Sequence, residues 1–305
     1  MKLTVTDEQK IQSCIEKAPS LQDALRLVYE DGSKCGLKTD EKTLFRTVLC
    51  YFKNKPYCTV FETHQDYVVN TKDPKQKRCE ISDLLTITYS RRLNGTKINF
   101  LQAKLVPFNQ SNLGLVHANN TDYFKFHLDS TQYRLLKDRP LIINTGLPST
   151  ILADACTESI TSYGVFYKVD ESINMAYEIT SLLQPSDPAT VTINGGRKLC
   201  YFNTTKTSHG LRRLNKFCCA PSNPYDLLST LSADTFEQAL LHFQIGSPVC
   251  RTMAMYLSEM IHNMLEPQTD TTNDFCNFID QMGYLRGTII ENLEAIGKEE
   301  YMKIT

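Results

Sequence analysis

Two neighbouring segments decide the fold: ISDLLTITY at residues 81–89 and KINFLQAKLV at residues 97–106, joined by a polar link that contains Asn94-Gly95. Both segments are rich in β-branched and aromatic residues, which are typical of strands. An Asn-Gly pair adopts positive φ at low cost and therefore favours a tight turn. The sequence predicts an antiparallel hairpin whose strands are Ile81–Tyr89 and Lys97–Val106.

The hairpin brings three polar side chains together. Residues i and i+2 of a strand share a face, so Gln102 and Lys104 project on one side while the alternating apolar residues face the core. Asp83 lies near the start of the partner strand, and closure of the turn brings it towards Gln102. We therefore expect Asp83, Gln102 and Lys104 at one end of a small sheet.

These side chains are of the types that hold a divalent cation against a phosphodiester. Mg²⁺ and Mn²⁺ take oxygen ligands, which the Asp83 carboxylate, the Gln102 amide and the backbone carbonyl of Ala103 can supply. Lys104 would orient the attacking water and stabilise negative charge. The same alternation of polar and apolar residues is also typical of an ordinary half-exposed sheet face, and this second interpretation stays open.

The order Asp, turn, Gln-X-Lys resembles the PD-(D/E)XK nuclease superfamily, specifically a subgroup of restriction-like bacterial proteins with glutamine at the second acidic position. The upstream pair His64-Gln65, the acidic Glu80 and the strand Leu101–Lys104 also look like proteins of this kind. The resemblance covers roughly residues 63–106, about a seventh of the chain. Because an amide replaces a carboxylate at Gln102, we expect weaker metal binding than at a two-carboxylate site.

The resemblance implies an α/β (α+β) protein with a restriction-endonuclease-like mixed sheet core, flanked by helices and extended by helical additions at both termini. It also implies a metal-dependent endonuclease that hydrolyses DNA with Mg²⁺ (or Mn²⁺) as cofactor and water as nucleophile. The expected setting is bacterial defence against phage or other foreign DNA, with a regulatory protein partner or a homo-oligomer as activator. RNA stays open as a substrate. The alternative is a catalytically inactive module of this fold that binds nucleic acid or a protein partner within a defence complex.

Similar families often use an additional helix-borne glutamate to position the metal or the lysine. Glu41, in the first turn of the helix expected after Asp40, is the candidate for this catalytic role, and a carboxylate that only suits the helix dipole is the alternative. Glu80 and Glu62 compete for the role. The three-residue spacing places Glu80 and Asp83 on opposite faces unless a bulge rotates the chain between them.

Residues 189–225 combine basic and aromatic side chains and contain no Asp or Glu. Such a segment can track a phosphate backbone, and a solvated basic surface or a partner interface is the alternative. We assign nucleic-acid binding to His64 and to the cations of this segment, which are Arg197, Lys198, Arg212, Arg213 and Lys216.

Overall charge does not indicate a nucleic-acid binder, because 33 Lys and Arg nearly balance 34 Asp and Glu and give a net charge of -1. A phosphate-binding surface must therefore be local. The eleven cysteines include no C-x-x-C pair, which favours reduced thiols in a cytosol over structural zinc. The set Cys200, Cys218, Cys219 and His209 is the alternative. With no apolar leader and no membrane-length apolar stretch, we expect a cytoplasmic protein without a membrane partner.

Along the chain we expect three regions: a helical N-terminal cap at 1–40, a core at 41–184 that the resemblance implies is nuclease-like, and a C-terminal β/helical region at 185–305. The cap contains two short helices broken near Pro19, and a third helix follows Asp40. Further helices are predicted at Glu171–Leu183, Thr235–Phe243, Val249–Leu265 and Phe275–Met282.

Overall fold

The computed structural model describes residues 5–53, 55, 58–63, 68–71, 78–90, 95–106, 114–118, 121–143, 147–169, 172–185, 197–203, 212–213, 225–226 and 231–248. The chain divides into two units, Met1–Pro248 and Val249–Thr305. The second unit lies outside the described residues, and with it the helices predicted at Val249–Leu265 and Phe275–Met282. The division at 40/41 and 184/185 stays a prediction.

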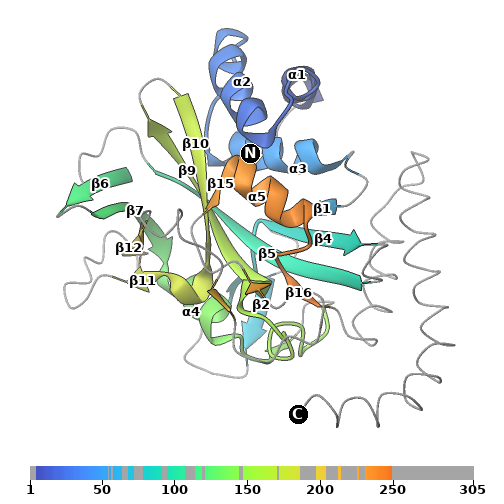
Figure 1. Ribbon diagram of the computed structural model, residues 1–305, viewed down its shortest axis with the longest axis vertical. Coiled ribbons are helices and arrows are strands. Elements are labelled where there is room, and N and C mark those ends of the chain that lie inside the picture. Colours follow the sequence, from blue (N-terminus) through green and yellow to red (C-terminus); the bar gives the residue numbers. More distant parts are fainter. Residues whose placement is uncertain are drawn as a thin grey trace, which may run out of the picture. The chain divides into compact units, whose positions relative to one another are not determined.

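A mixed sheet forms the centre of the first unit, with strand order β1–β4–β5–β9–β10–β15 (Figure 1). Its strands are β1 (Cys58–Glu62), β4 (Leu84–Ser90), β5 (Gly95–Leu105), β9 (Thr161–Val169), β10 (Ser172–Ile179) and β15 (Leu231–Ser232), and β16 (Ser247–Pro248) also pairs with β5. Strands β5 and β9 run parallel, whereas β4 and β5 run antiparallel. The predicted mixed α/β class is therefore confirmed.

The predicted hairpin is confirmed, with a later start of its first strand. Strand β4 begins at Leu84, which pairs with Leu101, and Ser90 pairs with Gly95 at the other end. The link at 91–94 lies outside the described residues. Before the strand, Asp83 is held at the backbone, because the Thr63 amide donates to its carbonyl at 2.8 Å.

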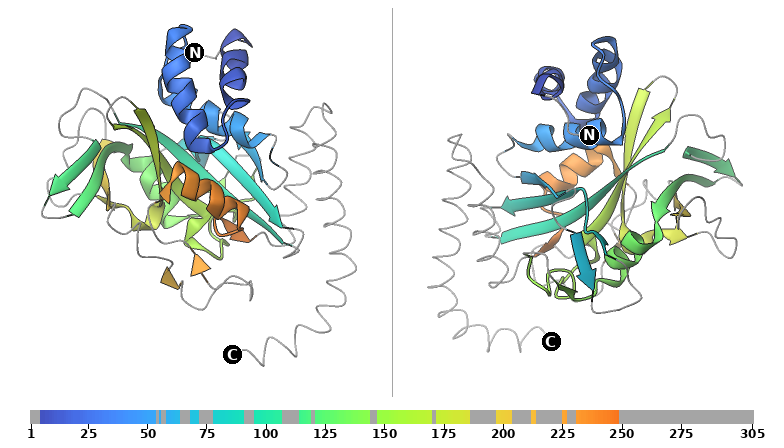
Figure 2. Two further views of the ribbon diagram at one scale, coloured as in Figure 1. Left: turned by 45° about the horizontal axis from the view of Figure 1, so that its top comes forward. Right: turned by 180° about the vertical axis from the view of Figure 1, so that it is seen from behind.

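Helices cover both faces of this sheet (Figure 2). They are α1 (Val5–Ile15), α2 (Leu21–Lys34), α3 (Glu41–Lys53), α4 (Ser130–Asp138) and α5 (Ala233–Leu241), with short 3-10 turns η1 (Glu158–Ile160) and η2 (Thr180–Leu182). Helices α2, α3 and α5 share one hydrophobic cluster with Leu101 and Ala103 of β5, whereas α4 packs in a second cluster with Tyr163 and Val165 of β9. The helices predicted at the N-terminal end and at Thr235–Phe243 are confirmed.

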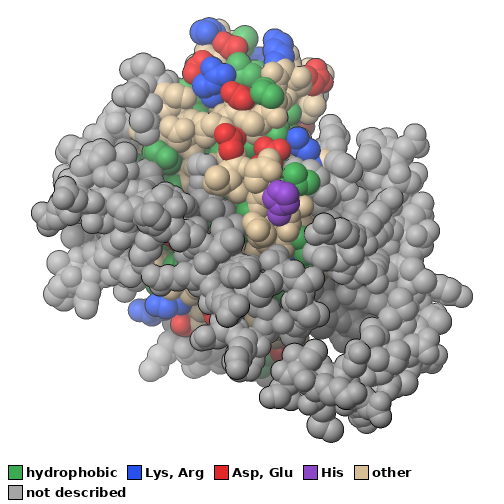
Figure 3. Space-filling view, viewed as in Figure 1, with side chains coloured by type: hydrophobic (Ala, Val, Ile, Leu, Met, Phe, Trp, Pro, Cys, Tyr) green, Lys and Arg blue, Asp and Glu red, His purple; other side chains and the backbone are tan. Residues whose placement is uncertain are grey.

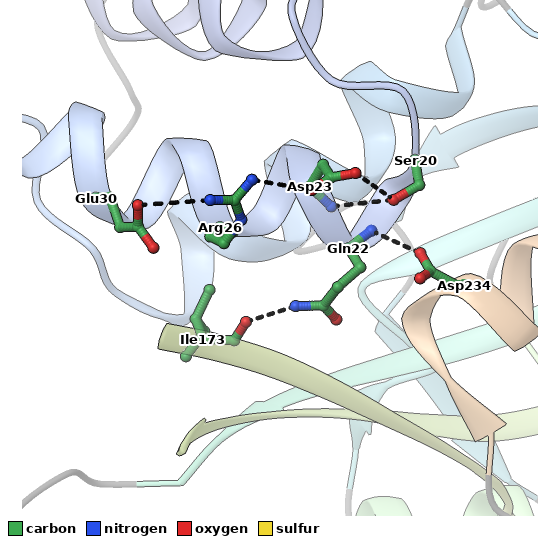
Figure 4. A network of polar contacts seen from close by, with 7 residues as sticks. All are labelled: Ser20, Gln22, Asp23, Arg26, Glu30, Ile173 and Asp234. Carbon is green, nitrogen blue, oxygen red and sulfur yellow. Dashed lines mark hydrogen bonds and ion pairs between the residues drawn. The ribbon is translucent and has the colours of Figure 1, made fainter. Parts of the chain in front are cut away.

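The N-terminus of α2 is tied to the sheet and to α5 by polar contacts (Figure 4). Ser20 caps the helix by accepting from the Asp23 amide at 3.2 Å. The Gln22 amide donates to the Asp234 carboxylate of α5 at 3.2 Å, and its side chain donates to the Ile173 carbonyl of β10 at 2.7 Å. These contacts fix the N-terminal helices on the sheet.

The helix predicted at Glu171–Leu183 is wrong, because most of this segment is strand β10. The side chains of Ile173, Met175 and Tyr177 alternate into the face of the sheet that α2, α3 and α5 cover. This is the period of two that defines a strand. Pairing with β9 along the full length of β10 satisfies its backbone and overrides the helical preference of Met and Ala.

Smaller sheets flank the central one. One contains β11 (Gln184–Pro185), β12 (Arg197–Asn203), β7 (Thr121–Asp129) and β6 (Gly114–Ala118); another contains β3 (Cys79–Glu80), β2 (Val68–Thr71) and β8 (Ile142–Ile143); a third pairs β13 (Arg212–Arg213) with β14 (Tyr225–Asp226). Asp129 ends β7 and caps α4, accepting from the amides of Thr131 at 2.7 Å and Gln132 at 3.0 Å. This junction fixes the start of α4.

The surface over α1 and α2 mixes charges of both signs (Figure 3). Arg26 pairs with Asp23 at 3.0 Å, and Lys34 pairs with Asp31 at 2.9 Å. These helices therefore do not form a basic surface. Within the part of the chain that the structure describes, no helix combines the length and the apolar character needed to cross a membrane.

Candidate metal and phosphodiester site

Asp83 and Gln102 lie together inside the protein, with exposed fractions of 3% and 2%. The Gln102 Nε2 atom donates to Asp83 Oδ2, and the backbone amide of Ala103 donates to the same oxygen at 2.7 Å. Hydrogen bonds of this kind compensate the cost of burying a carboxylate. An ordinary solvated sheet face is therefore the wrong interpretation for Asp83 and Gln102.

The three groups expected to supply metal ligands meet at one point. Gln102 Nε2 also lies 3.2 Å from the backbone carbonyl oxygen of Ala103. The end of the Gln102 side chain thus lies between the Asp83 carboxylate and the Ala103 carbonyl. Rotation of the amide by half a turn would replace Nε2 by Oε1 at this point, giving three oxygen atoms of three different chemical types.

Lys104 and Glu41 form an ion pair, with 3.6 Å between Lys104 Nζ and Glu41 Oε1. The other carboxylate oxygen of Glu41 accepts from the Leu105 amide at 2.7 Å. The side chains of Lys104 and Glu41 are 20% and 40% exposed. A partly exposed ion pair contributes little to stability, so its main consequence is to place an ammonium and a carboxylate at the end of β5.

The position of Glu41 follows from the start of α3. The Asp40 carboxylate accepts from the Thr43 amide at 3.0 Å and so caps the helix that carries Glu41. Burial tends to raise the pKa of Asp40, but hydrogen bonds from Thr43 and Lys38 outweigh it and hold this pKa below its usual range. Asp40 is therefore a charged cap at neutral pH.

The competing glutamates have other contacts. Glu62 forms an ion pair with Arg46 of α3, and Arg46 also reaches Glu8 of α1 at 3.2 Å. Glu80 lies in β3 opposite Val68, and its backbone carbonyl oxygen accepts a hydrogen bond from Gln132 Nε2 at 3.3 Å. Of the candidate glutamates, Glu41 is the one whose contact with Lys104 the structure records.

Gln132 of α4 belongs to the site, although the sequence did not identify it. Its Nε2 atom donates to Gln102 Oε1 and lies 3.3 Å from the Glu80 carbonyl oxygen. The side chain is buried, with an exposed fraction of 6%. A polar residue on the buried face of an amphipathic helix, next to Tyr133, was the signal that could have identified it.

The predicted nucleic-acid contacts lie largely beyond what the structure describes. His64 and Lys216 are outside the described residues, and for Arg197, Lys198, Arg212 and Arg213 the structure describes the strands β12 and β13 but not the side chains. Cys218, Cys219 and His209 are also outside. Among described residues, no group of three or more His, Cys, Asp or Glu side chains is placed to hold a metal ion. The convergence at Asp83 contains a single carboxylate and so differs in kind from such a group.

No protein-family model, curated protein or solved structure matches this chain. The site geometry and the Asp, turn, Gln-X-Lys resemblance are therefore the features that point to a function.

Proposed function

We propose that this chain is a Mg²⁺-dependent endodeoxyribonuclease with a restriction-endonuclease-like core. One observation carries the proposal: Asp83, Gln102 and the Ala103 carbonyl converge, and Lys104, two residues further along β5 than Gln102, pairs with Glu41. Burying a carboxylate and an amide together costs free energy that apolar side chains at the same place would not.

The donor set fits a hard divalent cation. The Asp83 carboxylate, the Gln102 amide oxygen and the Ala103 carbonyl would hold Mg²⁺ or Mn²⁺, which prefer oxygen ligands. When bound, the cation would neutralise charge on the phosphodiester and lower the pKa of water. A single carboxylate supplies less negative charge than a pair, so we expect weak binding.

Lys104 and Glu41, which are partly exposed, would act on the attacking water and on the charge of the phosphodiester. The Lys104 ammonium would hold the attacking water and stabilise negative charge on the phosphodiester as a point cation. Glu41 would position that ammonium, because its carboxylate is itself fixed by the Leu105 amide. Since Asp83 and Gln102 are buried, the substrate would approach from the side of Lys104 and Glu41.

The burial of the site and the balanced net charge together support dependence on an activator. DNA binding is normally assisted by a basic surface, which the total charge of -1 does not supply. By resemblance, the setting would be bacterial defence against foreign DNA, with a regulatory partner or a second copy as activator, and RNA as the alternative substrate.

A second candidate is a catalytically inactive module of the same fold that binds nucleic acid or a protein partner. It is favoured by the direct contact between Gln102 and Asp83, which satisfies both side chains without a cation. The two candidates differ in whether purified protein cleaves a phosphodiester in a metal-dependent reaction.

The test is incubation with plasmid, linear and single-stranded DNA and with RNA, in Mg²⁺, Mn²⁺ or EDTA. We expect cleavage that EDTA abolishes and that falls at least ~100-fold in Lys104→Ala, because removal of a group that stabilises developing charge costs about that much. The matched control is Lys17→Ala, which removes an exposed lysine in the turn after α1. Cleavage that persists in EDTA and in Lys104→Ala would contradict the proposal, and binding without any cleavage would support the inactive module.

A further inference from the structure

A chain of buried hydrogen bonds runs from α4 through the site. Gln132 Nε2 donates to the Glu80 carbonyl and to Gln102 Oε1, and Gln102 Nε2 donates in turn to Asp83 Oδ2 and to the Ala103 carbonyl. The chain therefore connects a helix, two strands and the one carboxylate of the site.

The direction of this chain is fixed by backbone carbonyls, which only accept hydrogen bonds. The Glu80 carbonyl requires Gln132 to present Nε2, and an Nε2 at that position requires Gln102 to present Oε1 towards α4. Gln102 must then present Nε2 to Asp83, where the Ala103 carbonyl also accepts it. Each amide orientation thus determines the next.

From this order, and building on the function proposed above, we infer that Gln132 is a hydrogen-bond lock that keeps the site in a cation-excluding arrangement. With Gln132 in place, the amide N–H groups of Gln102 lie where the oxygen ligands would meet a cation. If the Gln102 amide turned to present Oε1 to the cation, its Nε2 would face Gln132 Nε2. Two hydrogen-bond donors would then oppose each other. Binding of the cation must therefore break the contact between Gln132 and Gln102.

Gln132 is held by its helix and does not move freely. Asp129 caps α4 and accepts from the Gln132 amide at 3.0 Å. The hydroxyl of the next residue, Tyr133, donates to the Leu183 carbonyl at 3.1 Å, and Thr161 of β9 donates to the Leu136 carbonyl at 2.8 Å. Release of the lock in the intact protein therefore requires α4 to shift, which gives an activator one defined element to act on.

The test measures Mn²⁺ affinity by calorimetric titration of the full chain, without nucleic acid. Gln132→Met keeps the volume of the side chain and removes the donor, so we expect the Kd for Mn²⁺ to fall about tenfold, the factor that corresponds to one ordinary hydrogen bond. Adding Asp83→Asn to Gln132→Met should abolish this binding. Should Gln132→Met fold poorly by circular dichroism, Gln132→Leu makes the same comparison.

The control is Gln22→Met, the same substitution at a glutamine of α2 whose side chain donates to the Ile173 carbonyl, and it should leave the Kd unchanged. An equal or weaker Mn²⁺ affinity in Gln132→Met, or binding that survives Asp83→Asn, would overturn the lock. The proposed nuclease fails by a different result. If Gln132→Met changes the Kd for Mn²⁺ but the protein cleaves no nucleic acid, the lock stands and the proposed nuclease activity is contradicted. If cleavage is metal-dependent but the Kd is unchanged, the lock is contradicted and the nuclease activity stands.

Discussion

Asp83 is the residue on which the proposed site depends. It is 3% exposed and receives hydrogen bonds from Gln102 and from the Ala103 amide, both on the neighbouring strand. Hydrogen bonds from such donors compensate the cost of burying a carboxylate. When the carboxylate is removed, the Ala103 amide loses its acceptor, and Gln102 Nε2 keeps only the Ala103 carbonyl.

Asp83→Ala should therefore lower the free energy of unfolding by about 2–5 kcal/mol, since it leaves buried donors unsatisfied. Urea unfolding monitored by circular dichroism measures the change. Asp154→Ala, at an exposed position, is the control and should stay within about 0.5 kcal/mol of wild type. A similar stability for Asp83→Ala and Asp154→Ala would contradict the described contacts of Asp83.

Sequence reasoning could identify some of these residues but not their contacts. The proximity of Asp83 and Gln102 follows from strand parity and one turn, so it was predictable. The contact of Glu41 with Lys104 joins residues far apart in sequence, and a first-turn glutamate has several uses that local pattern does not separate. Gln132 was missed because glutamine is common in helices, and its importance arises only from the tertiary position of α4.

At the scale of elements, α3 brings its first residue to the end of β5. The start of this helix is set by Asp40, which accepts from the Thr43 amide and side chain. A shift of the helix start would move Glu41 relative to Lys104. The cap of α3 is thus linked to the geometry of the site.

Asp40→Ala should lower the free energy of unfolding by about 1 kcal/mol at pH 7, the usual effect of losing a helix cap. Because the folded pKa of Asp40 is lowered, this contribution is fully present above the unfolded pKa of about 3.9 and is lost as pH falls through the folded value. Urea unfolding between pH 7 and pH 2.5 should show the difference from wild type shrinking below about pH 4. The difference in stability between Asp40→Asn, which caps without titrating, and Asp40→Ala should stay constant over this window. A difference between wild type and Asp40→Ala that persists unchanged at pH 2.5 would be evidence against the charged cap.

The elements differed in how well local pattern determined them. The N-terminal helices and the β4–β5 hairpin have a clear period or a strong turn signal, and they could be predicted. Strand β10 has an alternating apolar face at Ile173, Met175 and Tyr177, yet its Met and Ala residues also suit a helix. Only its pairing with β9 decides between the two.

At the scale of the molecule, the cysteine thiols differ in how deeply the fold buries them. Cys35 and Cys156 are exposed, whereas Cys58 is buried. Burial raises the pKa of Cys79 to about 12 and also raises the pKa of Cys58. The thiolate is the reactive form, so both groups should be inert at neutral pH.

Iodoacetamide at pH 8 should modify Cys35 and Cys156 at least ~100-fold faster than Cys58 and Cys79 in the native protein. Peptide mapping by mass spectrometry gives the rate for each thiol. Urea should remove the difference, which provides the control. Equal rates in the native protein would show that β1 and β3 are not packed as described.

The most direct test of the proposed metal site is a crystal structure in Mn²⁺, with anomalous scattering used to locate the ion. We predict a manganese peak between the Asp83 carboxylate and the Ala103 carbonyl, with the Gln102 amide turned so that Oε1 faces the ion, and a stronger peak in Gln132→Met. Manganese ordered only elsewhere, with Gln102 Nε2 still donating to Asp83 in both proteins, would contradict it.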